Sequence, residues 1–491
     1  MARADALTVL KRQLEQEPFF APQQPVLFRT AHGCLDVLGA LGAEAGGTLA
    51  QMPLPARAAV AGQLLGEPVL RLRRSGMPGD AQGEVVRLPA LGGGSDEELA
   101  RRLAELKASD WAIPVVALWW LLWGKRSANA QRGAALFIHC DIPTGAGQGA
   151  SKAMLAAVAR TLRDLPQNSP AAASESDEEA QEIAQAVAAA EAMGESVRAA
   201  AVIAPSRLHV INALTAMDAR GLKPHILRFS AQPHRLVGPV PLPKNLRVLA
   251  LDTGVRHPEQ AGPSEELRTA AAMGTRIIET IYRDLGQQHT PLNGYLANVS
   301  PLLYRQYFRT LLPKRLRGSD FVRTYGGAGV VAQEAATLDE REGAPGGGGG
   351  GAGGGVYRVR TAVDHLIAEN EHAEQFLQAM EELADDDAAE KPMDKVERGR
   401  TLARAGRLLL ASHHSYRLRL ELSCKEADFL VDHLMLSGPE HGVYGARITA
   451  GGGGGTVAAL LDTSAEATDV LLETINAYRE FTDAPLAVTE A

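Results

Sequence analysis

Cysteine is scarce in this sequence, and the few cysteines present stand far apart. The chain of 491 residues has three, at positions 34, 140 and 424, and no CxxC pair. Such a count excludes a disulfide framework and a cysteine-based zinc cluster, and it favours a reducing compartment. The N-terminal stretch carries scattered charges and lacks the apolar core of a secretory signal. We therefore expect a cytoplasmic protein.

Long hydrophobic runs and a surplus of positive charge are also missing. The most apolar stretch, Trp111–Trp123, has thirteen residues, fewer than the ~20 that a membrane-spanning helix needs. A buried core helix is the favoured interpretation, and a membrane-surface segment is the alternative. The net charge of −8 argues against a concentrated basic face for nucleic acid. We expect no nucleic-acid partner and no membrane partner.

What the sequence does contain is typical of a globular protein with two or three domains. Apolar residues make up 45% of the chain and charged residues 22%. Two stretches are predicted to be flexible insertions because they cannot bury much apolar surface: an acidic one at 168–193 and a glycine-rich one at 343–355. A phosphate-binding role for the second is the less favoured alternative, because no helix start follows it.

Hydrophobic patterns predict strands and helices without a regular βαβ period, which favours an α+β fold. The predicted strands are Val26–Thr30, Ala134–Cys140, Leu246–Asp252, Ala446–Thr449 and Thr456–Asp462. The predicted helices are Ser151–Leu165, Ser264–Asp284 and Ser464–Phe481, and a strand-then-helix pattern begins at Tyr357–His372. Neither a GxxxxGK[ST] phosphate loop nor a complete GxGxxG dinucleotide-binding pattern is present.

Three segments carry most of the functional signal: Thr30–Leu54, Asp141–Ala153 and Val443–Leu460. The second joins a strand to a helix through small residues, and a helix N-terminus offers N–H groups and a positive dipole end to an anion such as a nucleotide phosphate. A plain glycine-rich turn is the alternative. The third places five glycines between two apolar strands, which indicates a loop packed against a ligand or another backbone.

In this order and at these distances, the three segments resemble the motifs of the GHMP kinases, most closely the galactokinase and L-arabinokinase branch. The stretches YGARITAGGGGGTVAAL, LALDTGVRH and YLANVSP carry the likeness. The resemblance implies an α+β fold of two domains after an extension at 1–20. Residues 21–240 would resemble ribosomal protein S5 domain 2, and residues 241–491 would be ferredoxin-like. It also implies ATP and Mg²⁺ as cofactors and a sugar-like small molecule as substrate.

The resemblance assigns roles to particular residues. The nucleotide-binding candidates are Gly145, Gly147, Gly149, Ser151, Lys152, Gly451, Gly452 and Gly453. Ser151 is also the candidate metal ligand, and Lys152 is either a charge clamp for phosphate or an ordinary first-turn lysine. The candidate substrate contacts are Asp36, Glu44 and Asp252. Asp218 is the candidate catalytic base, although the flanking sequence aligns better with Val210 in that place.

The sequence departs from the family pattern where the chemistry should be. Cys34 occupies the place of the family's arginine, and Ala43-Glu44 replaces its sugar-binding Asp-Tyr pair. One hydroxyl, that of Ser151, remains of a run of serines. We therefore predict a sugar-type kinase with an altered active site that does not bind galactose or arabinose in the usual way. The alternative is a catalytically inactive galactokinase-like protein that acts as a ligand sensor, regulator or partner subunit.

Overall fold

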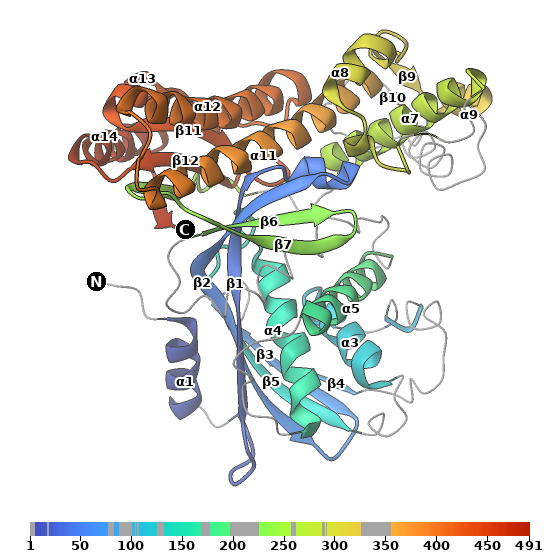
Figure 1. Ribbon diagram of the computed structural model, residues 1–491. Helices are drawn as coiled ribbons and strands as arrows, with labels where there is room; N and C mark the ends of the chain where they lie inside the picture. Colours follow the sequence, from blue (N-terminus) through green and yellow to red (C-terminus); the bar gives the residue numbers. More distant parts are fainter. Residues whose placement is uncertain are drawn as a thin grey trace.

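A computed structural model describes residues 5–16, 19–76, 83–87, 101–103, 105, 108–124, 132–167, 177–196, 225–256, 262–286, 290, 292–325 and 355–491. Within these residues, a large sheet with its helices lies beneath a smaller sheet covered by long helices (Figure 1). The chain is therefore of mixed α and β structure with two main layers of sheet, as the sequence predicts.

The large sheet comes from the N-terminal half of the chain. Its order is β4-β3-β5-β2-β6-β7, and β1 pairs with β2. The β3–β5 pair is parallel and the others are antiparallel. The strands are β1 (Leu27–Leu38), β2 (Thr48–Leu65), β3 (Val69–Ser75), β4 (Glu84–Arg87), β5 (Gly133–Cys140), β6 (His225–Ala231) and β7 (His234–Pro241).

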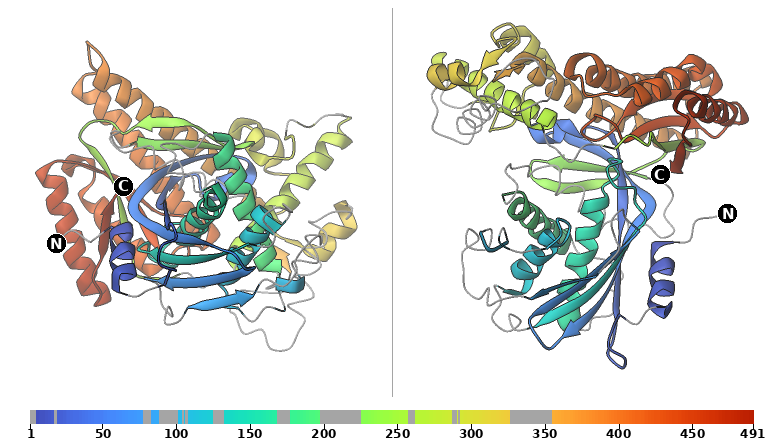
Figure 2. Two further views of the ribbon diagram at one scale, coloured as in Figure 1. Left: turned by 90° about the horizontal axis from the view of Figure 1, so that it is seen from below. Right: turned by 180° about the vertical axis from the view of Figure 1, so that it is seen from behind.

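Helices cover both faces of this sheet because its strands alternate their buried side chains with a period of two. In β2, Ala58 and Val60 pack under α4 (Ala150–Asp164), while Ala59 and Ala61 pack against α1 (Ala6–Gln16). Outside α4 lie α3 (Ala112–Trp119), its π-helical continuation η2 (Trp120–Gly124) and α5 (Asp177–Ser196), as Figures 1 and 2 show; η3 (Leu165–Gln167) follows α4.

Two sequence predictions about these helices have different outcomes. The Trp111–Trp123 stretch is confirmed as a core helix, with Trp119, Trp120 and Trp123 each 2% exposed. The insertion at 168–193 is predicted to be solvated with a helical continuation; the helix is present as α5, but at 179–191 it is packed rather than solvated. Ile183 and Val187 lie one helical turn apart and are buried, so an apolar stripe fixes this acidic helix to the core. Residues 168–176 lie outside the described residues.

The small sheet has the order β11-β12-β8-β13 and is antiparallel. Its strands are β8 (Leu246–Asp252), β11 (Val443–Ile448), β12 (Thr456–Asp462) and β13 (Ala487–Glu490). The helices around it are α11 (Val359–Ala388), α12 (Lys395–His414), its π-helical end η6 (Ser415–Leu420), α13 (Lys425–Ser437), the short turn η7 (Pro439–His441) and α14 (Ala465–Thr482). Since β7 ends at Pro241 and β8 begins at Leu246, the chain changes sheet close to the predicted boundary at 240.

The remaining elements gather at one end of the upper layer (Figure 1). They are α7 (Gly262–Asp284), η4 (Leu296–Asn298), α8 (Pro301–Leu303), η5 (Tyr304–Phe308), β9 (Leu316–Arg317), α9 (Gly318–Tyr325) and β10 (Val356–Tyr357). A short 3-10 turn, η1 (Leu41–Ala45), joins β1 to β2 and packs against α11. The glycine run from 346 to 354 lies outside the described residues.

One hydrophobic cluster joins the two sheets. It contains Leu35 and Val37 of β1, Phe376 of α11 and Leu460 of β12. The upper ends of β1 and β2 are thus fixed against the C-terminal helices. The predicted strand at Val26–Thr30 continues to Leu38, because β1 pairs with β2 along its whole length, with register shifts after His32 and after Asp36. The first motif therefore lies largely within paired strands rather than after a strand.

Candidate functional site

The second motif forms a tight loop between β5 and α4. Gly145, Gly147 and Gly149 have φ angles of 71°, 72° and 74°, a left-handed conformation that glycine adopts without strain. The loop is held to the first motif, because the Cys34 amide donates to the Gln148 carbonyl oxygen at 3.0 Å. Three closely spaced turns of this kind bring the backbone round to the start of α4.

The N-terminus of α4 has no side-chain cap. Gly149 occupies the capping position and makes no side-chain hydrogen bond, so the first amide groups of the helix point to its N-terminal end with the positive end of the helix dipole. Ser151 is exposed in this first turn. Lys152 is half-buried and forms an ion pair with Glu191 of α5. The predicted charge clamp thus already has a carboxylate partner.

The glycine-rich loop between β11 and β12 lies directly against the second motif. A Cβ at Gly455 would approach the Ala146 carbonyl oxygen to 2.7 Å, and one at Gly147 would approach Ala450 Cβ to 3.2 Å. Gly452, Gly453 and Gly455 all have positive φ angles. The sequence left open whether this loop packs against a ligand or another backbone, and the structure brings it against the backbone of the second motif.

The predicted glycine donors in this loop already donate to protein acceptors. The Gly452 amide donates to Thr449 O at 3.2 Å, and the Gly453 amide donates to Leu422 O at 2.7 Å. Gly451 is half-buried at the start of the loop. The amides of Gly452 and Gly453 therefore fix the conformation of the loop. The loop in turn packs against the backbone of the second motif.

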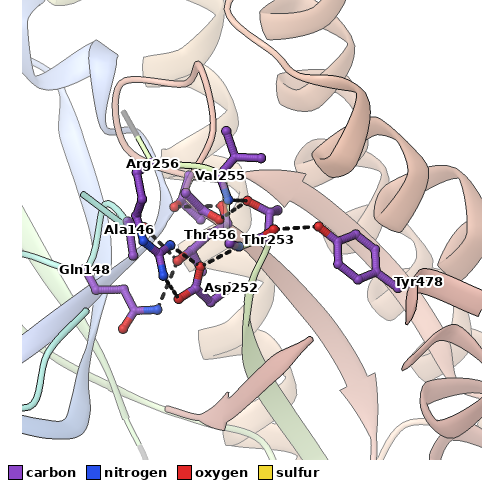
Figure 3. A network of polar contacts seen from close by, with 11 residues as sticks. Ala146, Gln148, Asp252, Thr253, Val255, Arg256, Thr456 and Tyr478 are labelled. Atoms are coloured by element: carbon purple, nitrogen blue, oxygen red, sulfur yellow. Dashed lines mark hydrogen bonds and ion pairs between the residues drawn. The ribbon is translucent and has the colours of Figure 1, made fainter. Parts of the chain in front are cut away.

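The strand end at Asp252 completes this region, as Figure 3 shows. Arg256 donates to both carboxylate oxygens of Asp252, at 2.5 and 3.0 Å, and the Gly254 amide donates to Oδ1 at 2.9 Å. Thr253 donates through its amide and its hydroxyl to the Gly455 carbonyl oxygen, at 2.9 and 2.6 Å. Asp252, the candidate substrate contact, is thus 5% exposed and engaged by three donors.

Four residues that sequence reasoning missed tie these segments together. Thr456 Oγ1 donates to Ala146 O at 2.8 Å and accepts from Gln148 Nε2 at 3.0 Å. The Tyr478 hydroxyl donates to Thr253 O at 2.6 Å (Figure 3), and the Tyr416 hydroxyl donates to Ala450 O at 2.8 Å. Burial raises the pKa of both tyrosines, so both remain donors. We call the contacts among Ala146, Gln148, 252–256, Gly455, Thr456 and Tyr478 the loop network.

Cys34 lies at the start of α4, where the alignment with the family expects an arginine. A Cβ at Gly149 would come within 3.0 Å of Cys34 Sγ, and the thiol side chain is 2% exposed. A neighbouring Gly33 Cβ would approach Gln148 O to 3.0 Å. The first and second motifs are therefore in contact, and a buried thiol stands beside the uncapped helix end.

The other first-motif candidates lie apart from this helix end. Asp36 is fully buried and accepts a hydrogen bond from the Gln51 side-chain amide opposite it in β2. Ala43 is buried in the N-terminal core cluster. Glu44 belongs to η1, and its side chain lies outside the described part of the structure. The structure thus gives Asp36 a structural partner and brings it close enough to Tyr416 to affect its pKa.

A second set of polar contacts holds the upper end of β1, and we call it the charged network. Arg447 of β11 lies 3.3 Å from Glu369 of α11 and donates to the Val37 carbonyl oxygen at 3.2 Å. Glu369 accepts from the Gly39 amide at 3.2 Å and from the Ser412 hydroxyl at 2.7 Å. Burial by itself would raise the pKa of Glu369, but Arg447, His365 and Ser412 together lower it.

Two predicted elements of the site lie outside the described residues. These are Asp218 and Val210, both within the stretch from 202 to 221, so the structure gives neither residue a position. No cluster of three or more His, Cys, Asp or Glu that could hold a metal occurs in the parts of the chain that are described. None of the helices in those parts is both long and apolar enough to cross a membrane.

The residues at the start of α4 are compatible with a nucleotide phosphate and with one hydrated metal ion. The start of α4 has no side-chain cap and follows three left-handed glycines, a backbone arrangement of the kind that binds anionic oxygens. Ser151 is exposed beside it, which suits a single hydroxyl contact to a metal that keeps most of its waters.

The chain is similar in sequence to known sugar kinases. No protein-family model matches the chain. It is 24% identical over 287 residues to an L-arabinokinase of Arabidopsis thaliana, which covers 52% of this chain and 24% of the relative. It is 33% identical over 112 residues to the galactokinase of Thermosipho africanus, covering 23% of this chain and 26% of that protein. The matched stretches thus span about a quarter of these relatives' own length.

Among solved structures, the galactokinase of Lactococcus lactis complexed with galactose matches with a TM-score of 0.64 at 16% identity, over 99% of this chain and 97% of that one. The fold is therefore that of the GHMP kinases. The relatives named above that match in sequence are sugar kinases, each over about a quarter of its own length.

Proposed function

We propose that this protein is an ATP-dependent kinase that phosphorylates a hydroxyl group of a sugar or sugar-like metabolite. The observation that carries the proposal is the uncapped start of α4 beside three left-handed glycines, supported from behind by a second glycine loop. Phosphoryl transfer depends mainly on positioning and charge stabilisation, which such a backbone cradle supplies. The scarcity of cysteine supports a cytoplasmic location. The kinase would consist of two domains, at 21–240 and 241–491.

The backbone of residues 145–151 would hold the phosphates of ATP, and Ser151 would contact the bound Mg²⁺. The metal would neutralise charge that develops on the transferred phosphoryl group. Asp218 remains the proposed base, because a carboxylate near the accepting hydroxyl orients it and takes its proton. Replacement by asparagine (Asp218→Asn) should lower kcat while the dissociation constant for ATP stays unchanged. An unchanged kcat would remove Asp218 from the mechanism.

The nucleotide site can be tested with one substitution and a matched control. Ser151 and Val396 are both exposed second residues of their helices, α4 and α12. A glutamate is compatible with either helix start, but Ser151→Glu places a negative charge at the proposed phosphate site. We expect Ser151→Glu to weaken ATP binding about tenfold or more in calorimetric titration, and Val396→Glu to leave it unchanged. Equal affinities of both variants would contradict the assignment.

The substrate is proposed to differ from galactose bound in the usual manner. Ala43 is buried where the relatives' pattern has a carboxylate, and a sugar hydroxyl left without its partner costs about 1–3 kcal/mol. An ADP-release assay over a panel of monosaccharides tests this. Efficient turnover of galactose at micromolar concentration would overturn it.

A second candidate function is that of a nucleotide- or sugar-sensing regulator without catalysis. Two contacts favour it: a thiol stands at the helix end where the family pattern has an arginine, and Lys152 is paired with Glu191. A neutral thiol supplies none of the charge of a guanidinium. Calorimetric binding of ATP without ADP release on any sugar of the panel would favour the regulator, and turnover would favour the kinase.

A further inference from the structure

A cleft of about 500 Å³ lies in the upper helical layer, apart from the loops discussed above. Its walls come from η5, the first half of α11, and the end of α12 with η6. It shares no lining residue with the second-motif loop or the glycine-rich loop. This volume is within the range of small-molecule sites in proteins.

Both carboxylates that line the cleft are occupied by protein donors. Asp364 accepts from the Tyr304 hydroxyl at 2.8 Å and from Arg309 at 2.8 and 2.9 Å. Glu369 belongs to the charged network described above and faces Arg447. Their negative charges are therefore compensated before any ligand arrives.

Two arginines at the rim have no carboxylate partner among the described residues. Arg305 donates only to the Pro301 carbonyl oxygen, at 3.2 Å. Arg419 is exposed and lines the same cleft as His365 and His372. Asp364 neutralises Arg309. The guanidinium groups of Arg305 and Arg419 therefore give the cleft a net positive charge.

The floor of the cleft has polar atoms without a partner. His365 is 1% exposed; its Nδ1 is 2.9 Å from the Ser415 hydroxyl, and its Nε2 has no hydrogen-bond partner. His372 Nδ1 is likewise buried and unpartnered. Unsatisfied buried polar atoms are costly, and two of them on one cleft indicate that something polar completes the site. A serine hydroxyl that donates to Nδ1 would leave Nε2–H as a donor on a residue that lines the cleft.

We propose that this cleft binds a small organic anion bearing phosphate or carboxylate groups, held by Arg305 and Arg419 at the rim and by His365 at the floor. Guanidinium groups suit the oxygens of either anion, and the histidine supplies a directional donor. The site goes beyond the proposed kinase function, because it does not depend on the loops that would hold ATP.

The test uses the full chain carrying Ser151→Glu, so that the helix end of α4 does not compete for the anion. Pyrophosphate and citrate are titrated separately by calorimetry. Binding of pyrophosphate alone assigns a phosphate ligand, binding of citrate alone assigns a carboxylate ligand, and binding of both assigns the shared anion chemistry. No heat from either probe at millimolar concentration would overturn the proposal.

Three further variants in the same background connect the binding to the cleft. Arg305→Glu with Arg419→Glu reverses both rim charges at exposed positions and should weaken binding about tenfold or more. His365→Phe should weaken it through loss of the floor donor. Arg479→Glu, an exposed change on α14 of the same helical layer, should leave it unchanged. Equal binding by the double variant and the Arg479→Glu control would show attraction by general charge and would also overturn the proposal.

Discussion

The loop network and the charged network both hold functional motifs in place, but they are built from different groups. The loop network uses backbone carbonyls, hydroxyls and glycines with positive φ, and its one ion pair, Asp252–Arg256, has a guanidinium that is 42% exposed. The charged network buries a full ion pair, Arg447 and Glu369, at 0% and 1% exposure. The fold thus keeps the proposed phosphate site close to neutral and fixes the end of the first motif with strong charges.

The two networks should therefore differ in how much stability is lost when one of their side chains is replaced. Neutral hydrogen bonds contribute about 1 kcal/mol each, so the loop network should tolerate single losses. Removing one partner of a buried ion pair leaves an uncompensated charge and costs about 3–5 kcal/mol.

The largest effect is expected from Arg447→Met. Loss of the guanidinium leaves Glu369 charged and buried, so we expect the free energy of unfolding to fall by about 3–5 kcal/mol in urea denaturation. Adding Glu369→Leu should recover part of this loss, because the pair is then replaced by apolar side chains. Arg479→Met, at an exposed position, is the control. A loss below about 1 kcal/mol for Arg447→Met would contradict the large contribution to stability expected of the buried ion pair.

The pH dependence of stability should come next. Burial lowers the pKa of His365 and of His413 from 6.5 to about 4 in the folded chain. Between these values the unfolded chain binds more protons, so stability is present above pH 6.5 and falls as the pH drops toward 4. Each histidine contributes up to about 1.4 kcal/mol per pH unit in this window.

The measurement is urea denaturation at several pH values between 7 and about 5. His365→Gln keeps a polar group near Ser415 but does not titrate, so its stability should fall less steeply than that of the unmodified chain. His441→Gln, at an exposed histidine, should leave the slope unchanged. If His365→Gln has the slope of the unmodified chain, His365 is not a buried neutral histidine.

A smaller loss is expected from Gly455→Ala in the loop network. Gly455 has φ 84° and its Cβ would meet Ala146 O at 2.7 Å, whereas Gly286 has φ 76° and open space around it. Both alanines pay about 1–2 kcal/mol for the left-handed backbone, and Gly455→Ala adds about 1 kcal/mol for one overpacked Cβ, which keeps its total at about 2–3 kcal/mol. Unfolding of the two variants in parallel isolates the contact between loops, and equal losses would mean that the loops separate easily.

The smallest effect is expected from Tyr478→Phe. It removes the 2.6 Å hydrogen bond to Thr253 O and should cost about 1–2 kcal/mol, since a buried carbonyl oxygen loses a partner. Tyr307→Phe, whose ring is 54% exposed, should be neutral. A loss for Tyr478→Phe as large as that for Arg447→Met would reverse the comparison between the two networks.

Local patterns in the sequence predicted many elements well. The strands at Leu246–Asp252 and Thr456–Asp462 have the predicted bounds, because each is a short apolar run with polar or glycine-rich neighbours. The helix start after the second motif was also predictable from its glycines. The packing of α5 was not, because its acidic and alanine-rich composition resembles that of a solvated segment while two β-branched residues one turn apart decide its burial.

The candidate site divides in the same way. Motif order identified the second-motif loop and the glycine loop, and the structure brings them into contact. Nothing in the sequence pointed to Gln148, Thr456 or Tyr478, because single hydroxyls and amides carry no local pattern. The partners of Lys152 and Asp252 were equally hidden, since Glu191 lies 39 residues away from Lys152 along the chain.

The sequence by itself determined the superfamily resemblance, the main strands and helices, and the positions of the glycines, because these depend on local hydrophobic periodicity and on backbone conformations that glycine alone adopts without strain. Tertiary structure decided which polar groups are satisfied and which charges are compensated. Arg447 and Glu369 lie 78 positions apart in the sequence and meet only in the folded chain, where β11 packs against α12 and α12 packs against α11. Long-range pairing of this kind depends on the packing of whole elements, which no local window of sequence records.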